Sequence, residues 1–123
     1  MKKVEIYLRS VLINKKDHLM LFDSNRNGAI NDLVTVAPAG SKVIWKRDHC
    51  SGIKKILRIY SKKGHGKIFR TEPRKCWFIN AFYLELSDKA EGEEAYSIEY
   101  LLHNKTRVTI DPVIKIPPPP SHG

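Results

Sequence analysis

The apolar residues of this chain recur with a period of two, and this pattern constrains the fold more than any other feature. A period of two is typical of a strand with one buried face, whereas no window keeps a period of 3.6 residues over three helical turns. Gly, Pro, Asn or Asp separates the alternating segments, which span residues 4–12, 33–47, 53–62, 80–87, 95–103 and 111–117. We therefore predict an all-β fold of seven to nine strands with little helix, arranged as an antiparallel two-sheet sandwich or a small barrel.

The alternation also predicts which side chains face the core. The first segment should bury Val4, Ile6, Leu8 and Leu12 and expose Glu5, Tyr7 and Arg9. The second should form a strand, a Pro-Ala-Gly turn and a further strand that carries Val43 and Trp45. The third should place Ile53, Leu57 and Ile59 on one face, and Lys54, Ile56, Arg58 and Tyr60 on the other.

The length predicts a single domain, residues 1–116, followed by a proline-rich tail, residues 117–123. Proline lacks the amide donor that a sheet requires, so the tail should be extended or frayed. No stretch approaches the ~20 apolar residues of a membrane span, and the N-terminus lacks a signal-peptide pattern, so we expect a cytoplasmic protein with no membrane insertion. Cys50 and Cys76 are expected as two reduced thiols, with one bridge between them as the alternative.

The net charge of +9 suggests an anionic partner such as nucleic acid, an acidic protein or a lipid headgroup. A soluble basic surface without any partner explains the same charge. The candidate polyanion-binding residues lie in one stretch: Lys54, Arg58, Tyr60, Lys62, Lys63, Lys67 and Arg70. Proteins that bind single-stranded nucleic acids use cations to contact phosphates and aromatic rings to stack on bases. Outward lysines also have a structural role, because they keep sheet edges from pairing with other chains.

Two segments resemble those of cupredoxin domains. Val36 (or Val34), Pro38, Gly40, Val43 and Trp45 match a hairpin after which His49 falls in the loop of the first copper histidine. Tyr96, Ile98, Tyr100 and His103 match the strand and loop that carry the copper cysteine and the second histidine. The resemblance implies a Greek-key β-sandwich of the cupredoxin type.

The copper ligand set of that family is incomplete in this chain. A blue-copper site needs two imidazoles and a thiolate, but Tyr100 stands at the thiolate position and no Met follows His103. We therefore expect no copper and no other cofactor. A residual zinc or copper site from His49, His103 and Cys50 is a weaker hypothesis, because a fourth ligand is not evident.

The chain also resembles small bacterial proteins of unassigned function. The matching residues of its C-terminal part are Asp111, Pro112, Ile114, Ile116, Pro117 and Pro118. This resemblance implies a ligand-free cupredoxin-like fold with no known activity.

The segment 23–34 looks like the start of a calcium-binding loop, with Asp23, Asn25 and Asn27 at alternate positions. An EF-hand needs a glutamate at its twelfth position, where this chain has Val34, and it needs flanking helices. The flanks here read as strands, and Asn27-Gly28 favours a tight connection. We expect a turn between two strands and no calcium.

Catalysis finds little support, because the chain has no nucleophile elbow, zinc-protease motif or phosphate loop. We therefore predict a non-enzymatic sandwich that binds or scaffolds a protein partner. The alternatives are a polyanion-binding module that uses residues 54–70 and a residual metal site at His49 and His103. A continuous basic stripe across Lys54, Arg58 and Lys62 would favour polyanion binding, and scattered charge around a flat apolar patch would favour a protein partner.

Overall fold

The computed structural model describes residues 2–24, 28–30, 33–48, 52–63, 66–76 and 79–118, and these residues contain no helix. They form eleven strands: β1 (Lys3–Ile13), β2 (Lys16–Asp23), β3 (Gly28–Ile30), β4 (Val34–Val36), β5 (Lys42–Arg47), β6 (Ile53–Ser61), β7 (Arg74–Lys75), β8 (Ala81–Glu85), β9 (Glu93–Leu102), β10 (Arg107–Ile110) and β11 (Val113–Lys115). The all-β prediction is confirmed. The predicted count was too low, because β3, β7 and β10 lie outside the segments that are predicted as strands.

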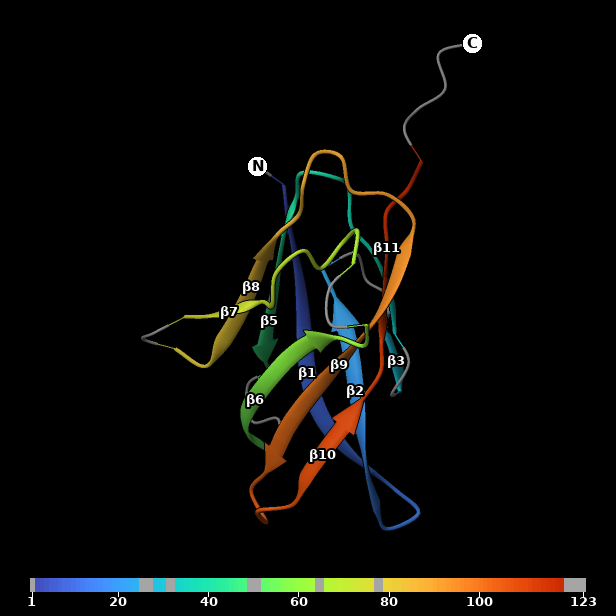
Figure 1. Ribbon diagram of the computed structural model, residues 1–123. Helices are drawn as coiled ribbons and strands as arrows, with labels where there is room; N and C mark the ends of the chain where they lie inside the picture. Colours follow the sequence, from blue (N-terminus) through green and yellow to red (C-terminus); the bar gives the residue numbers. More distant parts are fainter. Residues whose placement is uncertain are drawn as a thin grey trace.

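The strands form two sheets that face each other across one core (Figure 1). The six-stranded sheet has the order β3-β2-β1-β5-β8-β7. The five-stranded sheet has the order β10-β9-β11-β4, with β6 paired to β9 on its other side. This arrangement is consistent with a β-sandwich.

Both sheets are mixed, so the prediction of purely antiparallel pairing was wrong. β1 pairs with β5 in parallel, and β11 pairs with β4 in parallel, while the other pairs are antiparallel. Parallel neighbours need a crossover connection, and between β1 and β5 the chain passes through β4 of the other sheet. Alternation along a strand does not reveal the direction of its neighbours.

The strands on either side of the Pro-Ala-Gly turn do not form the predicted hairpin. β4 belongs to the five-stranded sheet and β5 to the six-stranded sheet, so the turn carries the chain from one layer to the other. Gly40 has a φ of 78°, a conformation that favours glycine, and its N–H donates to the carbonyl of Ser87 at 3.0 Å. The Ser41 hydroxyl donates to the Pro38 carbonyl at 2.6 Å and closes the turn.

β6 does not follow the predicted strict alternation. Its register against β9 shifts between Ile53 and Lys55 and again between Ile56 and Arg58. Each irregularity changes the phase of the strand, so Ile53, Ile56 and Ile59 are buried and Leu57 is partly exposed. The prediction that Ile56 faces outward was therefore wrong.

Val4, Ile6 and Leu8 are buried as predicted, whereas the side chain of Leu12 is 72% exposed. Leu12 lies near the end of the β1–β2 hairpin (Figure 1), where it lines a surface pocket together with Leu102, His103 and Asn104 at the end of the opposite sheet. Asn14 and Lys15 form the turn of this hairpin with φ values of 51° and 65°. The alternation continues to Leu12, but burial does not.

Three aromatic rings lie at the centre of the core. Trp45 on β5 and Tyr96 on β9 are fully buried, and the Trp45 Nε1–H donates to the Tyr96 hydroxyl at 3.0 Å. Phe69, in the segment between β6 and β7, stacks on Tyr96 with ring centroids 5.1 Å apart. These contacts join the two sheets and hold the 66–69 segment against them.

Candidate binding face on the six-stranded sheet

The predicted polyanion-binding residues lie on the outer side of β6 and in the segment that follows it. Among them, Arg58 pairs with Glu72, the Tyr60 hydroxyl donates to Glu99 at 3.1 Å, Lys62 lies 3.4 Å from Asp111, and Lys67 lies 3.1 Å from Glu91. Arg58 also covers the Tyr60 ring, 4.3 Å from its centroid. Lys54, Lys63 and Arg70 are exposed and form no ion pair within the described part of the chain.

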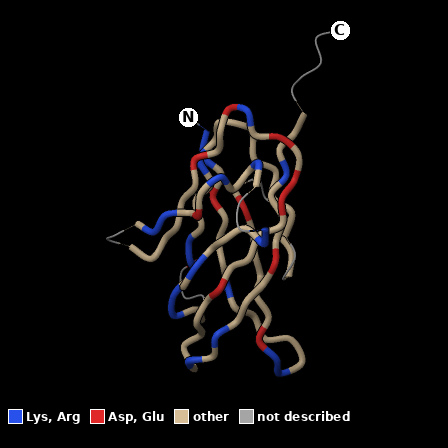
Figure 2. The backbone as a smooth tube through the Cα atoms, in the orientation of Figure 1, with Lys and Arg blue, Asp and Glu red and all other residues tan. Residues whose placement is uncertain are grey.

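These contacts make the charge on this side mixed. Lys and Arg are interspersed with Asp and Glu along the chain (Figure 2). The side chains of Arg58 and Lys62 remain about half exposed, so each pair is screened by solvent and contributes little to stability. The continuous basic stripe that would favour polyanion binding is therefore interrupted by carboxylates at Arg58 and Lys62. Polyanion binding through residues 54–70 stays a prediction.

Two of the three residues of the predicted zinc or copper site lie outside the residues that the structure describes. His49 and Cys50 lie outside the described residues, while His103 is exposed in the turn between β9 and β10. Within the described ranges, no three His, Cys, Asp or Glu side chains gather as a metal site would require. Tyr100, at the copper-thiolate position of the resemblance, is 3% exposed, and burial raises its pKa to about 12. It is a protonated phenol at neutral pH.

Of the calcium candidates, Asn25 and Asn27 lie outside the described residues. Asp23 is the last residue of β2 and is 5% exposed. The strands predicted on either side of this segment are present as β2 and β4, but β3 lies between them and pairs with β2. The segment therefore starts with a connection between adjacent strands of one sheet.

The outer side of the six-stranded sheet carries an arrangement that the sequence analysis missed. Six apolar or aromatic side chains point away from the core there, on strand positions that alternate with buried residues. We call them the aromatic face: Tyr7, Met20, Phe22, Ile30, Ile44 and Tyr83. All are partly exposed, and Ile30 is 40% exposed.

The strand register places these side chains in three cross-strand pairs, and between β1 and β5 Tyr7 lies diagonal to Ile44, with Lys46 opposite Tyr7 and Glu5 opposite Ile44. Met20 lies opposite Ile30, Tyr7 opposite Phe22, and Ile44 opposite Tyr83. The Tyr7 and Phe22 rings stack with centroids 5.4 Å apart and an interplanar angle of 22°. Residues directly opposite each other are the contacts that stabilise a sheet face.

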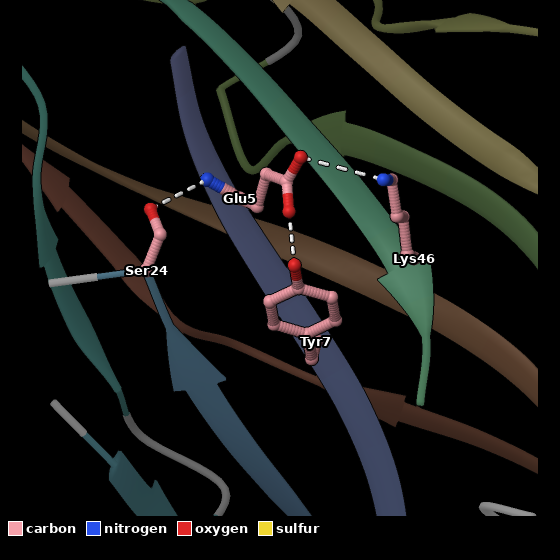
Figure 3. A network of polar contacts seen from close by, with 4 residues as sticks. All are labelled: Glu5, Tyr7, Ser24 and Lys46. Atoms are coloured by element: carbon pink, nitrogen blue, oxygen red, sulfur yellow. Dashed lines mark hydrogen bonds and ion pairs between the residues drawn. The ribbon is translucent and has the colours of Figure 1, made fainter. Parts of the chain in front are cut away.

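A polar network lies among the apolar side chains (Figure 3). The Glu5 carboxylate accepts a hydrogen bond from the Tyr7 hydroxyl and lies 3.4 Å from the Lys46 ammonium. The Ser24 hydroxyl accepts a hydrogen bond from the Glu5 N–H at 3.0 Å. The Tyr7 hydroxyl, and after it Lys46, lowers the pKa of Glu5, and the same hydrogen bond raises the pKa of Tyr7. Glu5 is therefore ionised at neutral pH and fixes the Tyr7 ring on the face.

A sequence signal for the aromatic face does exist. Residues 19–22 read Leu-Met-Leu-Phe, so both sides of this part of β2 are apolar, whereas on the outer side of β5 Ile44 lies between Lys42 and Lys46. Continuous apolar runs are typical of strands that are covered on both faces. A single sandwich buries only one face of each sheet, so the second apolar side signals a further contact.

The comparisons add no family to these observations. The chain matches no model of a known protein family, and no curated protein matches it either. Across the residues that the structure describes, no helix is long and apolar enough to span a membrane. The candidate site therefore stands on geometry alone.

Proposed function

We propose that this protein is a non-enzymatic β-sandwich that binds a protein partner through the aromatic face. The observation that carries the proposal is the set of three outward apolar pairs on five strands of one sheet, with the Glu5–Lys46 ion pair between the pairs of β1 and β5. Aromatic residues and Met are enriched where proteins contact each other, and contiguous apolar patches mark interaction sites. The outer face of a sheet that meets only water normally alternates with polar residues.

Polyanion binding through residues 54–70 is the alternative function. The ion pairs of Arg58, Lys62 and Lys67 with carboxylates weaken it, because a phosphate group would have to displace Glu72, Asp111 and Glu91. The distribution of charge and apolar surface thus supports a protein partner over a polyanion.

For the finer fold we propose a Greek-key, cupredoxin-like sandwich without bound copper. Its support is that the two segments of the resemblance meet in the core, where Trp45 of the first donates a hydrogen bond to Tyr96 of the second. An experimental structure compared with cupredoxin domains tests this assignment. A strand order that cannot be superposed on theirs would contradict it.

The binding proposal is tested by NMR titration with small organic probes. Phenol, isopropanol and acetonitrile collect at surfaces that bind proteins, so they should perturb Tyr7, Phe22, Ile44 and Tyr83 more than β6. Oligothymidylate at low salt is the second titrant, and we expect no saturable shifts from it. Probes that avoid the aromatic face, or oligothymidylate that saturates residues 54–70, would contradict the proposal.

A further inference from the structure

We infer that the partner of the aromatic face carries carboxylates around an apolar centre, an inference that rests on the proposed function. Two groups of cations lie on this side of the six-stranded sheet. Arg9 and Lys46 form the inner group, and each already has an acidic neighbour: Arg9 lies 3.6 Å from Asp48, and Lys46 lies 3.4 Å from Glu5. The inner cations are therefore neutralised within the chain.

The outer group lies on β1, β5 and β7 toward the Tyr83 side of the sheet, and we call it the cationic rim: Lys3, Lys42 and Arg74. Lys3 lies beside Lys42 in the parallel register, and Arg74 lies opposite Tyr83. The Lys42 ammonium is 4.7 Å from the Tyr83 ring centroid. Glu85 lies opposite Lys42, yet no rim residue is in an ion pair within the described ranges.

The cationic rim favours a partner with acidic side chains, because its charges are complementary to carboxylates. Opposite charges at the edge of an interface steer association, whereas like charges oppose it. A second copy of this chain would bring another net charge of +9 to the contact, so self-association is disfavoured.

A single-stranded nucleic acid fits less well. Base stacking needs free ring faces, and one face of each of Tyr7, Phe22 and Tyr83 is already occupied by a neighbouring side chain. We therefore assign the face to an acidic protein surface.

A random-peptide display library, selected on the immobilised full chain, tests this inference. Two charge-reversal variants receive the same selection: Lys42→Glu/Arg74→Glu at the rim, and Lys54→Glu/Lys55→Glu on β6 as a control with the same change in net charge. Ile44→Thr tests the apolar centre, because threonine also favours strands. Circular dichroism and urea titration check that each variant is folded.

We expect the selected peptides to combine apolar residues with Asp and Glu. Their Kd should rise about tenfold in the rim variant, as for the loss of two partly exposed charge contacts, and should stay within about twofold in the control. Salt should weaken binding to the unmodified chain and have less effect on the rim variant.

Two outcomes would overturn the inference and keep the proposed function. They are peptides that need Ile44 but show no acidic preference, and peptides whose Kd is the same in the rim variant. Peptides whose Kd is unchanged by Ile44→Thr, or a selection that yields no peptides, would overturn both the inference and the proposed function. If oligothymidylate competes with the selected peptides for the rim, the partner is a nucleic acid and the inference of an acidic protein is overturned.

Discussion

The side-chain amide of Asn80 pairs with the backbone of Ile56: its Oδ1 accepts from the Ile56 N–H at 2.7 Å, and its Nδ2 donates to the Ile56 carbonyl at 3.2 Å. Asn80 precedes β8 of the six-stranded sheet, whereas Ile56 lies on β6, an edge strand of the other sheet. Arg47 adds a second contact across the layers, donating to the carbonyls of Ile53 at 3.2 Å and Lys54 at 2.6 Å. Side chains thus cover part of an edge that could otherwise pair with another chain.

Asn80→Ala should destabilise the fold by about 1–3 kcal/mol, because it leaves the N–H and the carbonyl of Ile56 without these partners. Urea unfolding followed by circular dichroism measures the change. Asn104→Ala is the control, since Asn104 accepts a hydrogen bond from Thr106 in an exposed turn and should cost less than about 1 kcal/mol. Equal losses in the two variants would mean that the Asn80 contact does not hold the sheets together.

Tyr96→Phe should cost about 1–3 kcal/mol, because it leaves the buried Trp45 Nε1–H without its acceptor. Tyr60→Phe removes a hydroxyl that bonds to Glu99 on the partly exposed side of β6, and its cost should stay below about 1 kcal/mol. Both follow from the same urea titration. A Tyr96→Phe variant as stable as the original chain would refute the role of this hydrogen bond.

Gly66→Ala should destabilise by about 1–3 kcal/mol, because the new methyl group would overlap the Glu94 carboxylate. That carboxylate accepts a hydrogen bond from the Ile68 N–H at 3.2 Å and holds the segment that inserts Phe69 into the core. In a Glu94→Ala background the Gly66→Ala change should cost less, since the overlap is gone. Gly28→Ala, where an added methyl group meets only ordinary contacts, is the control and should change stability by less than about 0.5 kcal/mol. An additive double-mutant cycle would contradict this explanation.

The Glu5 network predicts a pH dependence with a defined sign. Because its folded-state pKa lies below the ordinary value of 4.5, Glu5 stabilises the fold above that pH and loses this contribution as the pH falls through the folded pKa. Tyr7→Phe should bring the pKa of Glu5 back toward the ordinary value, and Lys46→Gln should do so by a smaller amount. An NMR titration of the Glu5 carboxyl carbon measures these values. If Tyr7→Phe leaves the pKa of Glu5 unchanged, the Tyr7 hydroxyl is not the main cause of the lowered pKa.

Sequence patterns predicted the buried side of most strands. Val4, Ile6 and Leu8 are buried as expected, because one face of β1 meets the opposite sheet along most of its length. Leu12 and Ile56 were assigned to the wrong side for different reasons. Leu12 lies near the end of the β1–β2 hairpin, where burial ends although the alternation continues, and the bulges in β6 shift the phase at Ile56. Neither the point where burial ends nor a bulge is encoded in the identity of a single residue.

The candidate site depended even more on tertiary structure. The carboxylates that interrupt the basic stretch, Glu72, Glu91, Glu99 and Asp111, lie outside it in the sequence, and only the fold brings them to Arg58, Tyr60, Lys62 and Lys67. The aromatic face assembles residues of five strands in a spatial order that differs from their order in the chain. The apolar run at residues 19–22 is a sequence signal of this face that could have been recognised. It does not identify which residues of the other strands lie beside it.

Methyl cross-saturation NMR on the complex with a selected peptide tests the central claim most directly. Saturation of the peptide protons should transfer to the methyl groups of Met20, Ile30 and Ile44, which lie on three strands of the aromatic face. The buried methyl groups of Val43 and Ile98 serve as internal references. Transfer to the three face residues is the predicted result, and transfer centred on Leu57 of β6, with none to the face, would contradict the account.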